Sequence, residues 1–109
     1  MTENEVRAMV EKTGFPTAYH HFAEGQAPGL PFLVYLYPKS NNFSADGIVY
    51  QGINKLDIEL YTECKDPEAE RKVEAVLKEY GFFYEKNETY IESEKMYEVF
   101  YETEVLIDE

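Results

Sequence analysis

Apolar residues recur at helical spacing near the start of the chain. Val6, Met9 and Val10 fall on one face of a helix. They follow the stretch Thr2–Glu5, a capping box in which the threonine hydroxyl and the glutamate carboxylate each satisfy a free backbone N–H. We therefore predict a first helix over about residues 3–13. A helix this short needs a sheet to pack against.

A second helix has the clearest boundaries in the sequence. Asp66 is a favourable N-cap, Pro67 suits the first helical position, and Gly81 suits the end of the helix. The residues at helical spacing between them form an apolar stripe: Ala69, Val73, Val76, Leu77 and Tyr80. This pattern predicts a helix that buries one side and exposes the other.

Alternation of apolar and polar residues predicts the strands. The candidate strands cover residues 17–22, 31–38, 48–62, 82–91 and 94–107, with a turn expected at Asn87. The segment 31–38 is an apolar run between two prolines, so we predict a strand covered on both faces.

The order helix, three strands, helix, two strands is typical of the α+β class. Short links between consecutive strands favour an antiparallel or mixed sheet of about five strands, with both helices packed on one face. Because the chain has 109 residues, we expect one domain that spans residues 1–109.

Acidic residues dominate the composition, with 22 Asp and Glu against 10 Lys and Arg and a net charge of −12. Such a surface repels phosphate groups, which argues against direct binding to duplex DNA. Three interpretations remain open: solubility alone, mimicry of nucleic acid toward a basic partner, and lining of a passage through which DNA moves without sticking. No apolar run approaches the roughly 18–20 residues of a membrane span, and the acidic N-terminus lacks the pattern of a signal peptide.

The two histidines, His20 and His21, are adjacent in the stretch TAYHHFAEG. In a strand, neighbouring side chains point to opposite faces, so we do not expect the two imidazoles to bind one ion together. A helix would align His20 with Glu24 as a zinc pair, but Pro16 and the turn after the stretch leave little room for it. We expect structural or interface histidines, no metal site and no cofactor.

The other candidate catalytic residues also have ordinary structural explanations. Cys64 is the single cysteine, which suits a reducing cytosol, and no nucleophile motif surrounds it. Glu98, Glu102 and Glu104 alternate with apolar residues, a pattern typical of a solvated strand face. A general acid–base pair would need burial that separates two carboxyl pKa values. We predict no catalytic residue and no enzymatic activity.

Ten tyrosines and seven phenylalanines exceed what one small core requires. They indicate either a tyrosine-rich sheet face under the helices or contacts between subunits. The polar segment KSNNFSADG, residues 39–47, is either an ordinary hairpin loop or a functional one. The candidate channel-loop and interface residues are Ser40, Asn41, Asn42, Phe43, Asp46, Tyr97 and Tyr101.

Four motifs in this order cover most of the chain: LPFLVYLYP, INKLDIELYT, KDPEAERKVEAVLKEYG and MYEVFYETEV. Together they resemble the small tail-terminator, or tail-completion, proteins of long-tailed bacteriophages and prophages. The chain is shorter than many members of that family, which puts extra docking elements in doubt.

The resemblance implies a structural subunit that forms a ring, typically a hexamer, at the head-proximal end of the tail tube. There it would end tube polymerisation and offer the surface for head–tail joining. The implied partners are further copies of the chain, the major tail protein and the head–tail connector, with DNA as a passing strand only and no membrane. The implied locations are the host cytoplasm during assembly and then the virion tail. Family members direct a loop between strands toward the channel, and residues 40–46 occupy that position here.

Two other hypotheses belong to different functional classes. The first is an acidic inhibitor that mimics DNA and blocks a basic host protein. The second is a small enzyme that uses His20 and His21. The mass in solution separates a ring from a monomeric inhibitor, and replacement of both histidines by alanine tests the enzyme.

Overall fold

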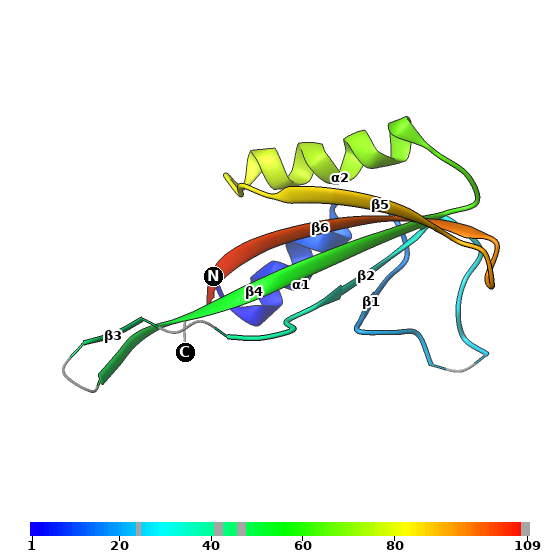
Figure 1. Ribbon diagram of the computed structural model, residues 1–109. Helices are drawn as coiled ribbons and strands as arrows, with labels where there is room; N and C mark the ends of the chain where they lie inside the picture. Colours follow the sequence, from blue (N-terminus) through cyan, green and yellow to red (C-terminus); the bar gives the residue numbers. More distant parts are fainter. Residues whose placement is uncertain (24, 41–42, 46–47, 108–109) are drawn as a thin grey trace.

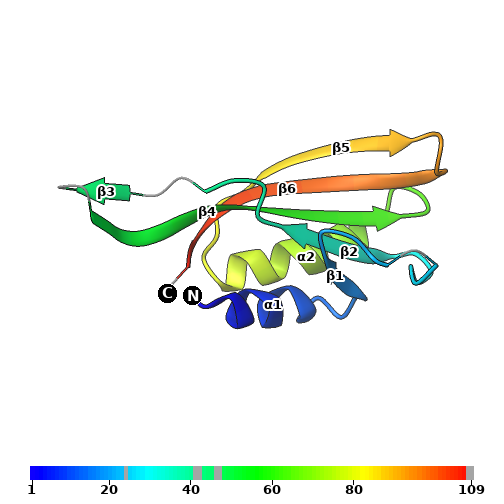
Figure 2. The same ribbon diagram turned by 90° about the horizontal axis from the view of Figure 1, so that it is seen from below.

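The fold has two layers, a mixed sheet and two helices on one of its faces (Figures 1 and 2). The computed structural model describes residues 1–23, 25–40, 43–45 and 48–107, with side chains outside residues 41–52. The elements are α1 (Glu3–Glu11), β1 (Thr17–Tyr19), β2 (Phe32–Leu36), β3 (Phe43–Ala45), β4 (Ile48–Thr62), α2 (Pro67–Glu79), β5 (Glu85–Ile91) and β6 (Met96–Ile107).

Five strands lie side by side in the order β1-β2-β4-β6-β5, and the short β3 pairs with the start of β4. β1 runs parallel to β2, and the other pairs are antiparallel. The predicted α+β class, the mixed sheet and the helices on one face are confirmed. β3 is an additional short strand within the segment predicted to be a loop.

Both helices begin as the sequence predicts. In α1, the Glu5 N–H donates to Thr2 Oγ1 at 3.1 Å, and the Thr2 N–H donates to Glu5 Oε1 at 3.0 Å. In α2, Asp66 is the N-cap, and its carboxylate accepts from the Ala69 N–H at 3.1 Å. These bonds satisfy N–H groups that have no partner within the helix. α1 ends at Glu11, two residues before the predicted end.

The core lies between the helices and the sheet. Its buried residues are Val6, Met9, Val10, Leu33, Tyr35, Leu56, Ile58, Leu60, Ala69, Val73, Val76, Leu77, Val99, Tyr101, Val105 and Ile107. Complete burial of one such aliphatic side chain contributes about 1.5–3 kcal/mol. The helices are therefore held on the sheet mainly by these apolar contacts.

β2 is buried on both faces, as predicted. Leu33 and Tyr35 belong to the core, while Phe32 and Val34 are buried on the opposite face. There the ring of Phe22, from the segment after β1, packs edge-on against Phe32 with ring centroids 5.1 Å apart.

The predicted turn at Asn87 is wrong. Asn87 lies inside β5, opposite Phe100 of β6. The turn comes later, at residues 92–95, where Lys95 has a φ of 50°. Pairing with a long neighbouring strand overrides the local preference of asparagine for turns.

Candidate functional site

The predicted channel loop lies in an arm formed by β3 and residues 48–52 of β4. The arm extends away from the helices and from the body of the sheet (Figure 1). At its base, Ser40 forms an isolated bridge with Asn54. Beside this bridge, the Lys55 N–H donates to the Lys39 carbonyl at 2.9 Å.

Part of the predicted loop is a strand. Phe43 begins β3 and pairs with Gln51, so its backbone is extended, contrary to the prediction. Asn41, Asn42 and Asp46 lie outside the described residues. Their role at a channel stays a prediction.

Tyr101 belongs to the core, which corrects its assignment as an interface candidate. Its side chain is fully buried beneath α2, and its hydroxyl donates to Glu74 Oε2 at 2.8 Å. Burial and this hydrogen bond raise the pKa of the Tyr101 hydroxyl. The aromatic ring of Tyr101 is therefore inaccessible to a second subunit. Alternation already places Tyr101 on the same strand face as Val99 and Val105, and this was the signal for its burial.

Tyr97 is half-buried at the edge of the core. Its hydroxyl donates to the Glu88 carboxylate of β5, and the Lys65 ammonium lies 5.9 Å from the centre of its ring. The side chain is thus held within its own subunit, and its role at an interface stays a prediction.

A buried ion cluster links α2 to β5 and to the loop before α2. The Glu70 side chain on α2 is almost completely buried, with Lys86 Nζ at 2.6 Å and Lys65 Nζ at 2.9 Å. Lys86 also contacts Glu74 at 2.9 Å, and Lys65 contacts Glu88 at 3.2 Å. The cluster fixes the helix over the edge of the sheet. The hydrophobic pattern of the sequence does not indicate it.

The pKa values in this cluster follow from the two lysines. Burial alone raises the pKa of Glu70, but hydrogen bonds from Lys65 and Lys86 outweigh it, and the net pKa is below the ordinary value. For Lys86, burial lowers the pKa, but the hydrogen bonds that its ammonium donates to Glu70 and Glu74 outweigh burial and raise the pKa. The hydrogen bond that Lys65 donates to Glu70 likewise raises the pKa of Lys65. Glu70, Lys65 and Lys86 are therefore all charged at neutral pH.

The sheet face opposite the helices, called the open face here, is strongly acidic. The strand register places six carboxylates and one lysine of β4, β5 and β6 on it: Asp57, Glu59, Glu85, Glu98, Glu102, Glu104 and Lys55. Asp57 pairs with Glu102, and Glu102 pairs with Glu85, so three carboxylates form a row across adjacent strands. Adjacent strands lie about 5 Å apart, which keeps like charges close.

Two of these carboxyls have raised pKa values. Burial is the largest cause for Asp57, and the nearby charge of Glu102 adds to it. Burial is also the largest cause for Glu59, where the Tyr61 hydroxyl donates at 3.0 Å and lowers the pKa in part, while Glu98 raises it. Ionisation of these two carboxyls therefore costs stability, mainly because they are buried and in smaller part because like charges lie close to them.

The two histidines do not lie on opposite faces, which corrects the strand-based prediction. β1 ends at Tyr19, and His20 has a left-handed backbone with a φ of 67°. The exposed imidazoles therefore meet, with their Nδ1 atoms 3.0 Å apart. Among the described residues, no group of three or more His, Cys, Asp or Glu side chains is placed to hold a metal ion.

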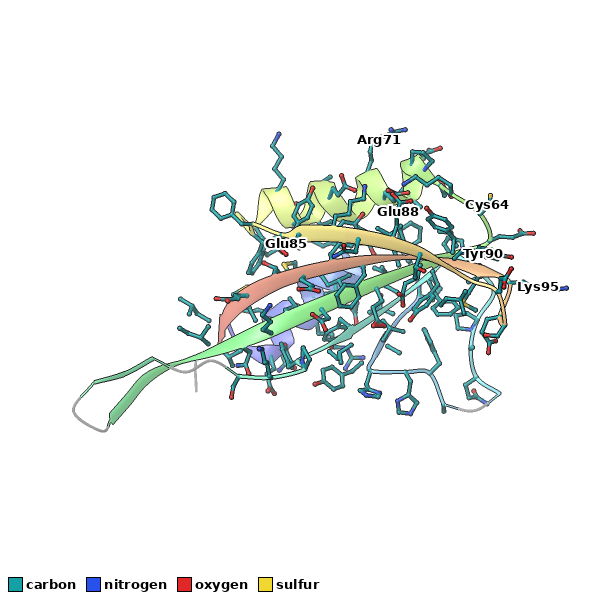
Figure 3. The ribbon with its side chains drawn as sticks, in the orientation of Figure 1. Cys64, Arg71, Glu85, Glu88, Tyr90 and Lys95 are labelled. Atoms are coloured by element: carbon teal, nitrogen blue, oxygen red, sulfur yellow. The ribbon has the colours of Figure 1, made fainter. Side chains whose placement is uncertain are left out.

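Cys64 is exposed on the loop that enters α2 (Figure 3). No described helix is long and apolar enough to cross a membrane.

A surface hollow of about 760 Å³ lies beside the last residues of β6, lined partly by residues 80–85 and 102–106. Phe83 lines it and is 95% exposed. This hollow was not predicted from the sequence pattern. The apolar pair Phe82–Phe83 directly after Gly81 was the available signal.

Comparison with known proteins finds no family model and no curated protein that matches the chain.

Proposed function

We propose that the chain is a structural subunit of a homo-oligomeric ring at the head-proximal end of a phage tail tube. In this role it ends tube polymerisation and offers the surface for head–tail joining, with the major tail protein and the head–tail connector as partners. The subunit acts in the host cytoplasm during assembly and then in the virion tail. The resemblance of the motifs suggests this function, and the projecting arm is the structural observation that carries it.

The arm supports the proposal because it extends where the helices do not cover the sheet (Figure 2). A two-stranded hairpin is marginally stable by itself in water, and it gains stability when another surface covers it. In a ring, the arm packs against a neighbouring subunit or borders the central channel. Either position gives the arm a function that an isolated subunit lacks.

The acidic open face suits a ring whose central channel lets DNA pass. It carries six carboxylates and one lysine, so the local electrostatic potential is negative. A negative wall repels the phosphates of passing DNA and prevents adhesion during passage.

A direct test mixes the purified chain with tail tubes assembled from the major tail protein. We expect electron microscopy to find rings at one end of tubes that stop growing. A variant with residues 41–47 replaced by an Asn-Gly turn should remain folded by circular dichroism and lose the rings. A control variant shortens residues 92–95 in the same way. Absence of rings with the intact chain, or full activity of the arm variant, contradicts the proposal.

The row of carboxylates across β4, β6 and β5 favours one alternative, an acidic inhibitor that mimics DNA toward a basic host protein. This alternative requires a stable monomer or dimer that binds basic proteins with an affinity that falls steeply as salt rises. Ring formation on tail tubes would exclude it.

A further inference from the structure

β6 extends beyond its partner β5. The first pair between these strands joins Glu85 to Glu102, whereas β6 continues to Ile107. On its other side, β6 remains paired with β4 as far as Gly52. Within the described residues, β6 therefore has no strand partner on its β5 side from Thr103 to Ile107. This segment is called the free edge.

Backbone groups of alternate residues on the free edge point to the β5 side. The Met1 ammonium donates to the Leu106 carbonyl at 2.8 Å, which shows the direction of this carbonyl, and an added strand replaces this terminal donor or pairs beside it. Backbone groups of every second residue in a strand point to the same side. Glu104, two residues before Leu106, therefore presents its N–H and C=O to the same edge, where β5 has already ended.

Apolar surface borders the free edge. The hollow of about 760 Å³ has residues 81–85 on one side and residues 102–106 on the other. Phe83 is 95% exposed and Leu106 is 44% exposed, and both line this hollow. Aromatic side chains in such positions are enriched where proteins meet partners.

The charge around the free edge selects the partner. Glu85, Glu102 and Glu104 line the hollow, against the Lys55 ammonium and the terminal ammonium of Met1. Lys55 is 3.7 Å from Glu102, and the described residues offer Glu85 and Glu104 no ion pair. Because carboxylates outnumber cations at this edge, it attracts a basic segment and repels the equally acidic edge of a second copy.

We propose that the free edge binds an extended, basic segment of a partner protein as an added strand. Main-chain hydrogen bonds to Glu104 and its neighbours supply affinity, and side chains supply specificity. On the open face, an apolar side chain of the segment lies beside Leu106 and under Phe83. A Lys or Arg two residues away contacts Glu104. This binding does not depend on ring formation by the chain.

The test uses the intact chain and a synthetic peptide, acetyl-TKTLTKT-amide, which presents Lys, Leu and Lys on one strand face. We expect the peptide to bind with a dissociation constant below about 1 mM. In nuclear magnetic resonance spectra, the amide chemical shifts of Thr103–Ile107 should change on binding. Two further peptides carry N-methyl groups on the odd or on the even residues. Only one set of amides faces β6, so one methylated peptide should bind about tenfold more weakly and the other should bind normally.

Two variants and two controls complete the test. Phe83→Ala and the pair Glu85→Gln with Glu104→Gln should each weaken binding about fivefold or more. Tyr90, labelled in Figure 3, lies toward the other end of the β5–β6 hairpin, and Glu92 and Glu94 lie in its turn. Tyr90→Ala and the pair Glu92→Gln with Glu94→Gln remove comparable groups there and should leave peptide binding unchanged. Absence of binding, equal binding of both methylated peptides, or equal loss in the controls overturns the proposal. Self-association of the chain that Phe83→Ala abolishes would assign the edge to a second copy and overturn it as well.

Discussion

At the scale of single residues, Glu70 has the most unusual environment, because a charged carboxylate is buried between α2 and the sheet. Its charge is balanced by Lys65 and Lys86, and loss of one partner from a buried ion pair is costly. Glu70→Gln should lower the free energy of unfolding by about 2 kcal/mol, less than for a fully buried pair because both lysines remain partly exposed. Urea titration followed by circular dichroism measures this change.

The matched control is Glu68→Gln, two residues away on the exposed side of α2. It should change the free energy of unfolding by no more than about 0.5 kcal/mol. Equal effects of the two substitutions would contradict the view that the buried cluster stabilises the fold.

The residue scale is also where sequence patterns failed most often. Alternation assumes a strand, and the left-handed backbone at His20 ends β1 before the alternation reaches the histidine pair. Alternation indicates that Tyr101 is buried, since it shares a strand face with Val99. The large number of tyrosines led instead to its prediction as an interface residue. Nothing in the pattern marks the burial of Glu70, because its partner Lys86 lies in a distant strand.

At the scale of elements, helix starts were the best predicted feature because N-capping is local. The side chain that begins a helix accepts a hydrogen bond from a backbone N–H a few residues away, so both partners stand together in the sequence. Strand boundaries depend on partners that are distant in the sequence. Asn87 illustrates this, because its pairing with Phe100 keeps β5 continuous through a predicted turn. The position of β3 also depends on its pairing with β4, which a polar, Asn-rich segment does not reveal.

The cap of α1 gives a prediction at this scale. Thr2→Ala removes the hydroxyl that accepts from Glu5 N–H and leaves that group without its partner. We expect a loss of about 1 kcal/mol in the free energy of unfolding, measured by urea titration. Asn4→Ala, at an exposed position in the same helix, is the control and should have no comparable cost. A larger loss for the control would contradict the capping argument.

At the scale of the whole molecule, negative charge gathers on the face that no helix covers. The core and the fold class follow from the periodicity of apolar residues, whereas this asymmetry appears only when the strand register aligns β4, β6 and β5. The net charge of −12 was visible in the sequence, but its location was not. The location matters because it leaves one face suited to repel nucleic acid and to attract basic partners.

This charge distribution predicts how stability depends on pH. Asp57 and Glu59 have raised pKa values in the folded chain, so the folded state binds their protons more readily than the unfolded state does. Their ionisation therefore costs stability as pH rises through the folded pKa values, and stability should increase as pH falls from 7 toward 5. Glu70 has the opposite sign, since its lowered pKa stabilises the fold above its ordinary value of 4.5 and that contribution disappears in more acidic solution.

Melting temperatures measured between pH 8 and pH 4 should therefore rise toward mildly acidic pH and then fall. The double substitution Asp57→Asn with Glu59→Gln removes the two groups with raised pKa values. It should raise the melting temperature at pH 7 and flatten the increase between pH 7 and pH 5. The control pair Glu92→Gln with Glu94→Gln changes the net charge equally at the exposed β5–β6 turn and should keep the increase. A melting temperature that falls steadily from pH 7 to pH 5 in the unaltered chain would mean that ionisation of Asp57 and Glu59 does not limit stability.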